Sequence, residues 1–124
     1  MNKQQQKRSK ILTDTIVEGM QEVKAQDIVV LDLTDIPNTV TDYFVICSGE
    51  SSTQIDGITS SVTRHTRSEI KERPWRIEGK GTSEWVLIDY VNVVVHVFYK
   101  NARPVYDIED LWSDAKRTDI PNLN

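Results

Sequence analysis

Apolar residues recur at helical spacing in the first part of the chain and alternate with polar residues further on. Within residues 9–24 an apolar residue appears every three or four positions, which predicts an amphipathic helix with one apolar stripe. The residues of this stripe are Leu12, Ile16, Met20 and Val23. Two β-rich runs follow, 27–33 and 43–47, and Pro37 lies between them. These runs predict two strands joined by a loop.

A second helix is predicted to begin after Ser51, because Ser51 and Gln54 have the spacing of a capping box. This helix should end before Pro74, since the residue before a proline disfavours the helical conformation. Three short strands are expected next, at residues 75–78, 84–90 and 93–99. Pro104 suits the first turn of a last short helix. The apolar side of that helix would be formed by Val105, Ile108, Leu111 and Trp112.

The predicted element order is helix, two strands, helix, three strands and helix, without repeats or low-complexity segments. A chain of 124 residues is long enough for one core and too short for two. We therefore expect an α/β (α+β) fold, in which helices pack on a mixed sheet. The expected organisation is a flexible N-terminus at 1–8, one domain at 9–114 and a polar C-terminal tail at 115–124.

The last two predicted strands form a hairpin with two distinct faces if Val91 and Asn92 make a two-residue loop. Tyr90 then pairs with Val93, and alternation assigns every other side chain to the same face. One face is almost wholly apolar and is predicted to lie in the core: Val86, Ile88, Tyr90, Val93, Val95 and Val97. The other face mixes aromatic, aliphatic, acidic and imidazole side chains: Trp85, Leu87, Asp89, Val94, His96 and Phe98.

This mixed face has the composition of a partner-binding surface, in which apolar anchors are combined with polar groups that orient the partner. The alternative is that helices cover this face too, and that His96 is a core histidine with satisfied hydrogen bonds. The residue pattern alone favours neither interpretation.

Charge and composition restrict the class of partner. The net charge is −4 and the pI about 5.1, so a general attraction to phosphate backbones is not expected, and a basic protein would be the better partner. Cys47 is the single cysteine, and its apolar neighbours indicate a small buried side chain in a reducing compartment. The apolar runs are too short for a membrane span, and no secretory signal is recognisable. We therefore expect a cytoplasmic location and no membrane partner.

Residues suited to catalysis are few. The chain has two histidines, His65 and His96, and no Gly-x-Ser-x-Gly motif, which argues against a catalytic triad. No HExxH, CxxC or full phosphate-binding motif indicates a metal or nucleotide site. Asp107, Glu109 and Asp110 could form a metal-binding carboxylate group, but the dipole of the last predicted helix favours negative charge in its first turns. We expect no cofactor, no metal and no catalytic activity.

Several segments together resemble the ribosomal silencing factor family, also called Iojap. They are EWVLIDY at 84–90, VVVHVF at 93–98, residues 103–112, DIVVLD at 27–32 and DYFVICSG at 42–49. The resemblance implies an α/β domain similar to nucleotidyltransferases. It also implies a binding function: members dock on a ribosomal protein at the intersubunit face of the large ribosomal subunit, block joining of the small subunit and repress translation. Together with the mixed face, this implies a site in which Trp85 is the anchor, Asp89 and His96 orient polar contacts, and Leu87 and Phe98 fill an apolar patch.

Three features depart from the family pattern. The strand-to-helix junction reads Gly49-Glu50-Ser51, where the family more often has threonine in the middle. The hairpin tip reads Val91-Asn92 instead of the usual Gly-Asp, and Val91 resists the positive φ that a tight turn requires. The third departure is the tail beyond Ala115.

Other functions are compatible with parts of the sequence. A residual nucleotidyltransferase-like enzyme would need Asp-x-Asp after the junction to hold magnesium and nucleotide, and the chain lacks it there. A large-subunit assembly factor would contact ribosomal RNA through Lys71, Arg73, Arg76 and Lys80, although such charged segments are usually only solvated. RNA is therefore not expected as the main partner. An exposed apolar face would also allow the free protein to form a homodimer.

Overall fold

The computed structural model describes residues 3–82 and 84–123. Its elements, in chain order, are α1 (Lys3–Glu22), β1 (Gln26–Asp32), β2 (Tyr43–Gly49), α2 (Ser52–Ile70), β3 (Arg76–Glu78), β4 (Trp85–Asp89), β5 (Val93–Tyr99), α3 (Arg103–Tyr106), α4 (Ile108–Leu111) and β6 (Lys116–Ile120). The strands form one six-stranded sheet in the order β3-β4-β5-β2-β1-β6. β2 and β5 are parallel, and the other neighbouring pairs are antiparallel. The predicted mixed α/β fold is therefore confirmed.

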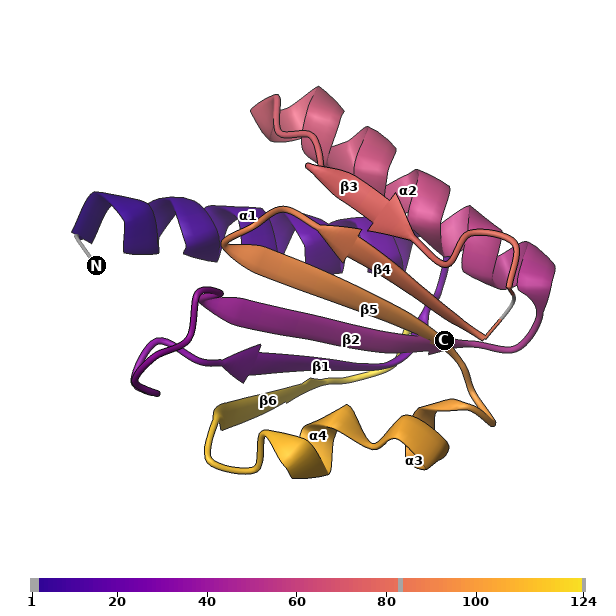
Figure 1. Cartoon of the computed structure of the whole chain (residues 1–124). Coiled ribbons are helices and arrows are strands. Elements are labelled where there is room, and N and C mark those ends of the chain that lie inside the picture. Colours follow the sequence, from indigo (N-terminus) through magenta and orange to yellow (C-terminus); the bar gives the residue numbers. More distant parts are fainter. Residues whose placement is uncertain (1–2, 83, 124) are drawn as a thin grey trace.

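Helices lie on both faces of the sheet (Figure 1). The long helices α1 and α2 pack side by side on one face, and the short helices α3 and α4 lie on the other. The larger core, beneath α1 and α2, includes the whole predicted core face of the hairpin: Val86, Ile88, Tyr90, Val93, Val95 and Val97. A smaller cluster on the opposite face consists of Val29, Leu31, Leu33, Ile46, Phe98 and Ile108. None of the helices in the described residues is long and apolar enough to cross a membrane.

The hairpin between β4 and β5 has the predicted register. The Tyr90 backbone N–H donates to the Val93 carbonyl at 2.9 Å, and each β4 residue has the β5 partner that this pairing requires. Val91 adopts a positive φ of 75° at the tip, where its N–H donates to the Asp89 carboxylate at 2.7 Å. The two-residue loop therefore forms even though its first residue is β-branched.

Val91→Gly should raise the free energy of unfolding by about 1 kcal/mol, because glycine adopts a positive φ without the steric cost of a β-branched side chain. Denaturant unfolding of both proteins measures the difference. Val40→Gly is the matched control: Val40 is 90% exposed and is not among the positive-φ residues, so this change should lower stability slightly. Equal effects of the two substitutions would contradict the assignment of strain to Val91.

The sequence predicted the start of α2 correctly but not the start of α1. Ser51 caps α2 as predicted, with the Gln54 N–H donating to the Ser51 hydroxyl at 3.1 Å. α1, in contrast, begins at Lys3, so residues 3–8 continue the helix where a flexible terminus was expected. Ser9 fastens this part of α1, because its buried hydroxyl donates to the Asp42 carboxylate at 2.5 Å and accepts from the Asn92 amide at 2.7 Å.

The C-terminal region differs from the prediction in two ways. The segment expected to be a polar tail contains β6, which pairs antiparallel with β1 from Ile28↔Ile120 to Asp32↔Lys116. The single predicted helix is divided into α3 and α4 at Asp107, whose φ is +48°. As a result Val105 and Leu111 are 79% and 77% exposed and do not form an inward apolar side.

The break between α3 and α4 has a physical reason. Arg103 and Ile108 are both buried against the sheet. In one continuous helix, residues five positions apart point in directions about 140° apart, so both could not face the sheet. The left-handed conformation of Asp107 turns α4 so that both side chains point inward.

Candidate partner-binding site

The five predicted site residues lie together on the face of the sheet that carries α3 and α4. Trp85 and Phe98 are cross-strand partners, as are Leu87 and His96, so the residues form adjacent rows on β4 and β5. Trp85, Leu87 and Asp89 are half-buried, whereas His96 and Phe98 are buried. The alternative prediction, that this face is covered by other parts of the protein, therefore holds for the β5 residues His96 and Phe98.

A continuous row of aromatic rings extends beyond the predicted site. The Trp85 ring stacks on Phe98 with centroids 5.1 Å apart and contacts Tyr106 of α3 at 4.8 Å. Phe44 of β2 meets the His96 ring edge-on at 4.8 Å and Trp112 at 5.6 Å. We call this surface the aromatic face: Phe44, Trp85, Leu87, His96, Phe98, Tyr106 and Trp112. It joins four separate segments of the chain.

Sequence reasoning missed Phe44, Tyr106 and Trp112 as members of this face. Alternation along residues 43–47 does separate Phe44 from the core residues Val45 and Cys47 on its strand. However, Phe44 lies beside His96 only because β2 and β5 pair in parallel. That pairing has no signal in the local sequence.

His96 positions the Trp85 indole. The indole N–H donates to His96 Nδ1 at 3.1 Å, so the other ring nitrogen of the neutral imidazole, Nε2, carries the proton. Nε2 has no hydrogen-bond partner within the described residues. Burial lowers the pKa of His96 from 6.5 to about 4, so the ring is neutral at physiological pH and Nδ1 stays an acceptor. His96 is therefore buried and holds the Trp85 indole in place, whereas a residue that contacts a partner directly would be exposed.

The His96 pKa makes stability depend on pH. Between pH 6.5 and about 4 the unfolded chain binds a proton at His96 that the folded protein does not. Stability should therefore be fully present above pH 6.5 and fall by an amount on the order of 2–3 kcal/mol as the pH drops toward 4. In His96→Asn the side-chain oxygen can replace Nδ1 as the acceptor but cannot titrate in this range. Unfolding free energies of both proteins between pH 7 and about 4 should diverge, and parallel curves would refute the assignment.

Both carboxylate oxygens of Asp89 contact groups within the protein. One carboxylate oxygen accepts the Val91 N–H, and the other lies 3.4 Å from Arg76 Nε on the neighbouring strand β3. Its side chain is 15% exposed. Asp89 therefore holds the hairpin tip and leaves only a small part of its carboxylate for a partner.

Helices α3 and α4 are fixed to the sheet by Arg103. The guanidinium donates to Glu109 at 2.6 Å, to the Ser48 hydroxyl at 2.8 Å and to the Asp27 carbonyl at 2.7 Å. Arg103 and Glu109 side chains are only 11% and 15% exposed. This ion pair and its hydrogen bonds hold the segment that presents Tyr106 and Trp112 to the aromatic face.

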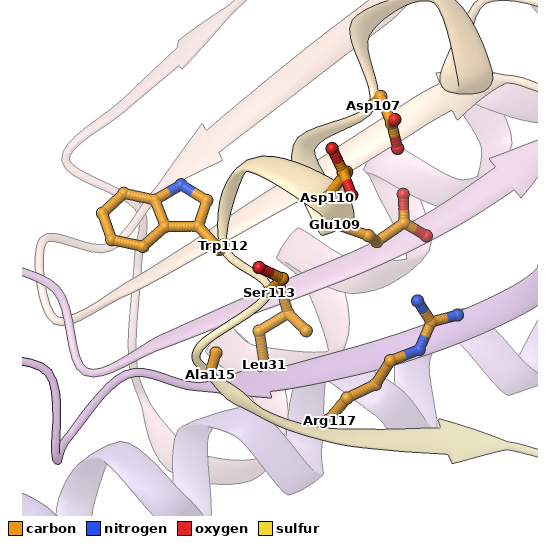
Figure 2. Close-up of a pocket in the computed structure, with 8 residues that line it drawn as sticks. All are labelled: Leu31, Asp107, Glu109, Asp110, Trp112, Ser113, Ala115 and Arg117. Atoms are coloured by element: carbon orange, nitrogen blue, oxygen red, sulfur yellow. The ribbon is translucent and has the colours of Figure 1, made fainter.

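A pocket of about 360 Å³ lies between α4 and the strands β1 and β6 (Figure 2). Leu31 and Trp112 line one part of it, and the acidic residues 107, 109 and 110 lie opposite Arg117. Glu109 is already paired with Arg103, and Arg117 with Asp119 at 3.0 Å. No group of three or more His, Cys, Asp or Glu side chains in the described part of the chain is arranged to hold a metal ion.

The strand-to-helix junction after β2 is occupied by the protein's own side chains. The Ser48 hydroxyl accepts from Arg103, and the Glu50 N–H donates to the Gln54 side chain at 2.6 Å. Cys47, directly before this junction, is fully buried, and desolvation raises the pKa of its thiol to about 12. The thiol is therefore protonated at neutral pH and is not placed to act as a nucleophile.

Comparison with known proteins identifies close relatives. A family model described as "Ribosomal silencing factor during starvation" matches residues 5–124. The chain is 37% identical over 115 residues to a protein of Halalkalibacterium halodurans named ribosomal silencing factor, a match that covers 90% of this chain and 94% of the relative. The match includes residues beyond Ala115, which the sequence alone set apart as a departure.

Two further matches extend the comparison. A mouse protein named "Mitochondrial assembly of ribosomal large subunit protein 1" is 28% identical over 102 residues, which are 81% of this chain and 44% of that protein. A crystal structure of a Chromobacterium violaceum protein superimposes with a TM-score of 0.78 at 30% identity, covering 84% of this chain and 85% of that one. The fold described above is thus shared with a solved structure of similar sequence.

Proposed function

Because this chain belongs to the ribosomal silencing factor family, we propose that it binds a ribosomal protein on the intersubunit face of the large ribosomal subunit and blocks joining of the small subunit. The mechanism is steric exclusion without a catalytic step, and the result is repression of translation in the cytoplasm. The observation that carries this proposal is the aromatic face, which presents partly exposed aromatic and aliphatic side chains on a rigid sheet.

The structure changes the set of residues proposed to contact the partner. Trp85 and Leu87 remain direct contacts because both are partly exposed. Phe98 is completely buried beneath Trp85, and His96 orients the indole, so these two support the contact surface. Tyr106, which is 45% exposed, packs against Trp85, and Leu111, which is 77% exposed on α4 on the same side of the sheet, is proposed as a further contact. A central aromatic anchor surrounded by exposed apolar side chains is typical of binding hot spots.

Charge supports a basic partner. The chain carries a net charge of −4, and ribosomal proteins that bind RNA are generally basic. Opposite net charges raise the association rate and help to orient the encounter, while the apolar anchors determine how long the complex lasts. An exposed apolar face of this kind would also allow the free protein to form a homodimer.

The enzymatic alternative is not favoured by the site geometry. A nucleotidyltransferase-like enzyme would bind its nucleotide and magnesium at the junction after β2. Here the Arg103 guanidinium donates a hydrogen bond to the Ser48 hydroxyl and forms an ion pair with Glu109. We therefore propose that this junction stabilises α3 and α4.

Sedimentation with separated ribosomal subunits tests the proposal. The protein should pellet with the large subunit and not with the small one. In a subunit-joining assay, large subunits loaded with the protein should form fewer complete ribosomes than unloaded subunits. Binding to the small subunit alone, or normal joining by saturated large subunits, would refute steric exclusion. The second result would favour a role in large-subunit assembly, the activity in the name of the mouse relative.

A further inference from the structure

Residues 64–80 concentrate positive charge that docking through the aromatic face does not use. Six basic and three acidic residues give this segment a net charge of +3 in a chain whose net charge is −4. The basic residues are Arg64, Arg67, Lys71, Arg73, Arg76 and Lys80, and all are exposed. Five of the six, Arg76 excepted, have no ion pair or side-chain hydrogen bond within residues 3–82 and 84–123.

The end of a helix accounts for only part of this charge. Arg67 and Lys71 lie at the C-terminus of α2, where the helix dipole favours cations. Arg73 and Lys80 lie outside the helix and gain nothing from its dipole. Exposed cations that fold stability does not require remain available for a partner.

Trp75 lies in the middle of this segment and is 69% exposed. The Arg76 guanidinium is 4.9 Å from the centroid of its ring. An indole with so much exposed surface gains little from folding, since most of its apolar area stays in water. An exposed aromatic ring within a segment of net positive charge is the combination on which nucleic-acid bases stack while their phosphates are neutralised.

Arg76 is the residue of the basic segment that lies beside β4, whereas Arg64 and Arg67 lie on α2, on the face of the sheet opposite the aromatic face. Arg76 of β3 is the cross-strand partner of Asp89 on β4, and their side chains lie 3.4 Å apart. A partner bound to the aromatic face would therefore leave α2 and residues 71–75 uncovered and free for a second contact with the surroundings of that partner. On a ribosomal subunit the surroundings of a protein consist largely of RNA.

We propose that residues 64–80 form an RNA-binding surface, in which Arg67, Lys71 and Arg73 neutralise phosphates and Trp75 stacks on an unpaired base. This surface contacts ribosomal RNA beside the docked ribosomal protein, and that location rests on the proposed function. An acidic polypeptide would satisfy the cations but would leave the exposed indole unused.

Fluorescence anisotropy with a labelled single-stranded RNA of about 16 nucleotides measures this activity without any ribosomal protein. The triple variant Arg67→Gln/Lys71→Gln/Arg73→Gln should lower the affinity at least about tenfold and reduce the slope of log affinity against log salt by about 2. Trp75→Ala should lower the affinity about 5- to 100-fold and leave that slope unchanged, because stacking releases no counterions.

A matched control removes three other cations that are exposed and unpaired within the described residues: Lys7→Gln/Arg8→Gln/Lys24→Gln. This variant should retain nearly full RNA affinity. Trp85→Ala should also retain it, because Trp85 lies on the aromatic face. A loss of ribosomal docking can therefore be distinguished from a loss of RNA binding. The proposal is overturned if the control loses as much affinity as the Arg67/Lys71/Arg73 variant. It is also overturned if polyglutamate competes as well as RNA, or if the unaltered protein does not bind RNA at low salt.

Discussion

Replacing Arg103 with alanine should lower the free energy of unfolding by about 3–5 kcal/mol, the cost of breaking a buried ion pair by removing one partner. The Glu109 carboxylate, whose side chain is only 15% exposed, would lose its counter-ion. The Ser48 hydroxyl and the Asp27 carbonyl would each lose a donor. Urea unfolding followed by circular dichroism measures the loss.

Two companion variants separate this explanation from a general effect of lost charge. Lys10→Ala breaks the exposed pair Lys10–Asp14, whose side chains are about 60% exposed, and should change stability by no more than about 0.5 kcal/mol. Arg103→Met/Glu109→Leu removes both charges and should recover much of the stability lost in Arg103→Ala. If Arg103→Ala costs no more than Lys10→Ala, the pair is effectively solvated and does not hold α3 and α4.

Trp85→Ala should weaken binding to the large subunit roughly 30- to 1000-fold, the range of about 2–4 kcal/mol that central aromatic anchors contribute. The indole is partly exposed and contacts the rings of Phe98, Tyr106 and His96. Sedimentation at several protein concentrations gives the two dissociation constants. Unchanged binding by a folded Trp85→Ala protein would show that the aromatic face is not the docking surface.

Folding and docking must be separated in this experiment, because Trp85 also covers Phe98. Leu111→Ala removes a side chain that is 77% exposed, so it should leave stability intact and still weaken binding several-fold. Ile11→Ala is the matched control, since Ile11 is 52% exposed on α1, which covers the opposite face of the sheet. Ile11→Ala should bind as tightly as the unaltered protein.

The hairpin and the main core could be predicted because their signals are local. Alternation on β4 and β5 allows one register that buries all six apolar residues together, and the structure has that register despite the strained Val91. A slip of one residue would expose the whole apolar set. The burial energy of several side chains exceeds the cost of one unfavourable turn residue, which is about 1–3 kcal/mol.

β6 and the division of the last helix could not be predicted in this way. Lys116–Ile120 is mostly exposed and has almost no apolar pattern, so its sequence is that of a tail. It forms a strand because the edge of β1 offers unpaired backbone groups, and β6 satisfies them. Similarly, the periodicity of 105–112 suits one helix, and only the sheet beneath it requires the turn at Asp107.

The face proposed as the partner-binding site was predicted in part. Alternation selected Trp85, Leu87, Asp89, His96 and Phe98 correctly as one face, but it could not say how deeply each side chain lies. Depth was decided by segments distant in sequence: Tyr106 covers Phe98 from α3, and Phe44 covers His96 from β2. Because alternation concerns one hairpin only, it contains no information about these neighbours.

The amino-acid sequence by itself determined the family, the mixed α/β fold, the register of the hairpin and the separation of its two faces. Each of these depends on residues close together in the chain, where side-chain periodicity and steric limits act directly. The tertiary structure decided which residues of the second face reach the surface, how Arg103 joins Ser48 to Glu109, and that residues 116–120 complete the sheet. These contacts join residues up to about ninety positions apart, and their energies appear only after long-range pairing has brought the segments together.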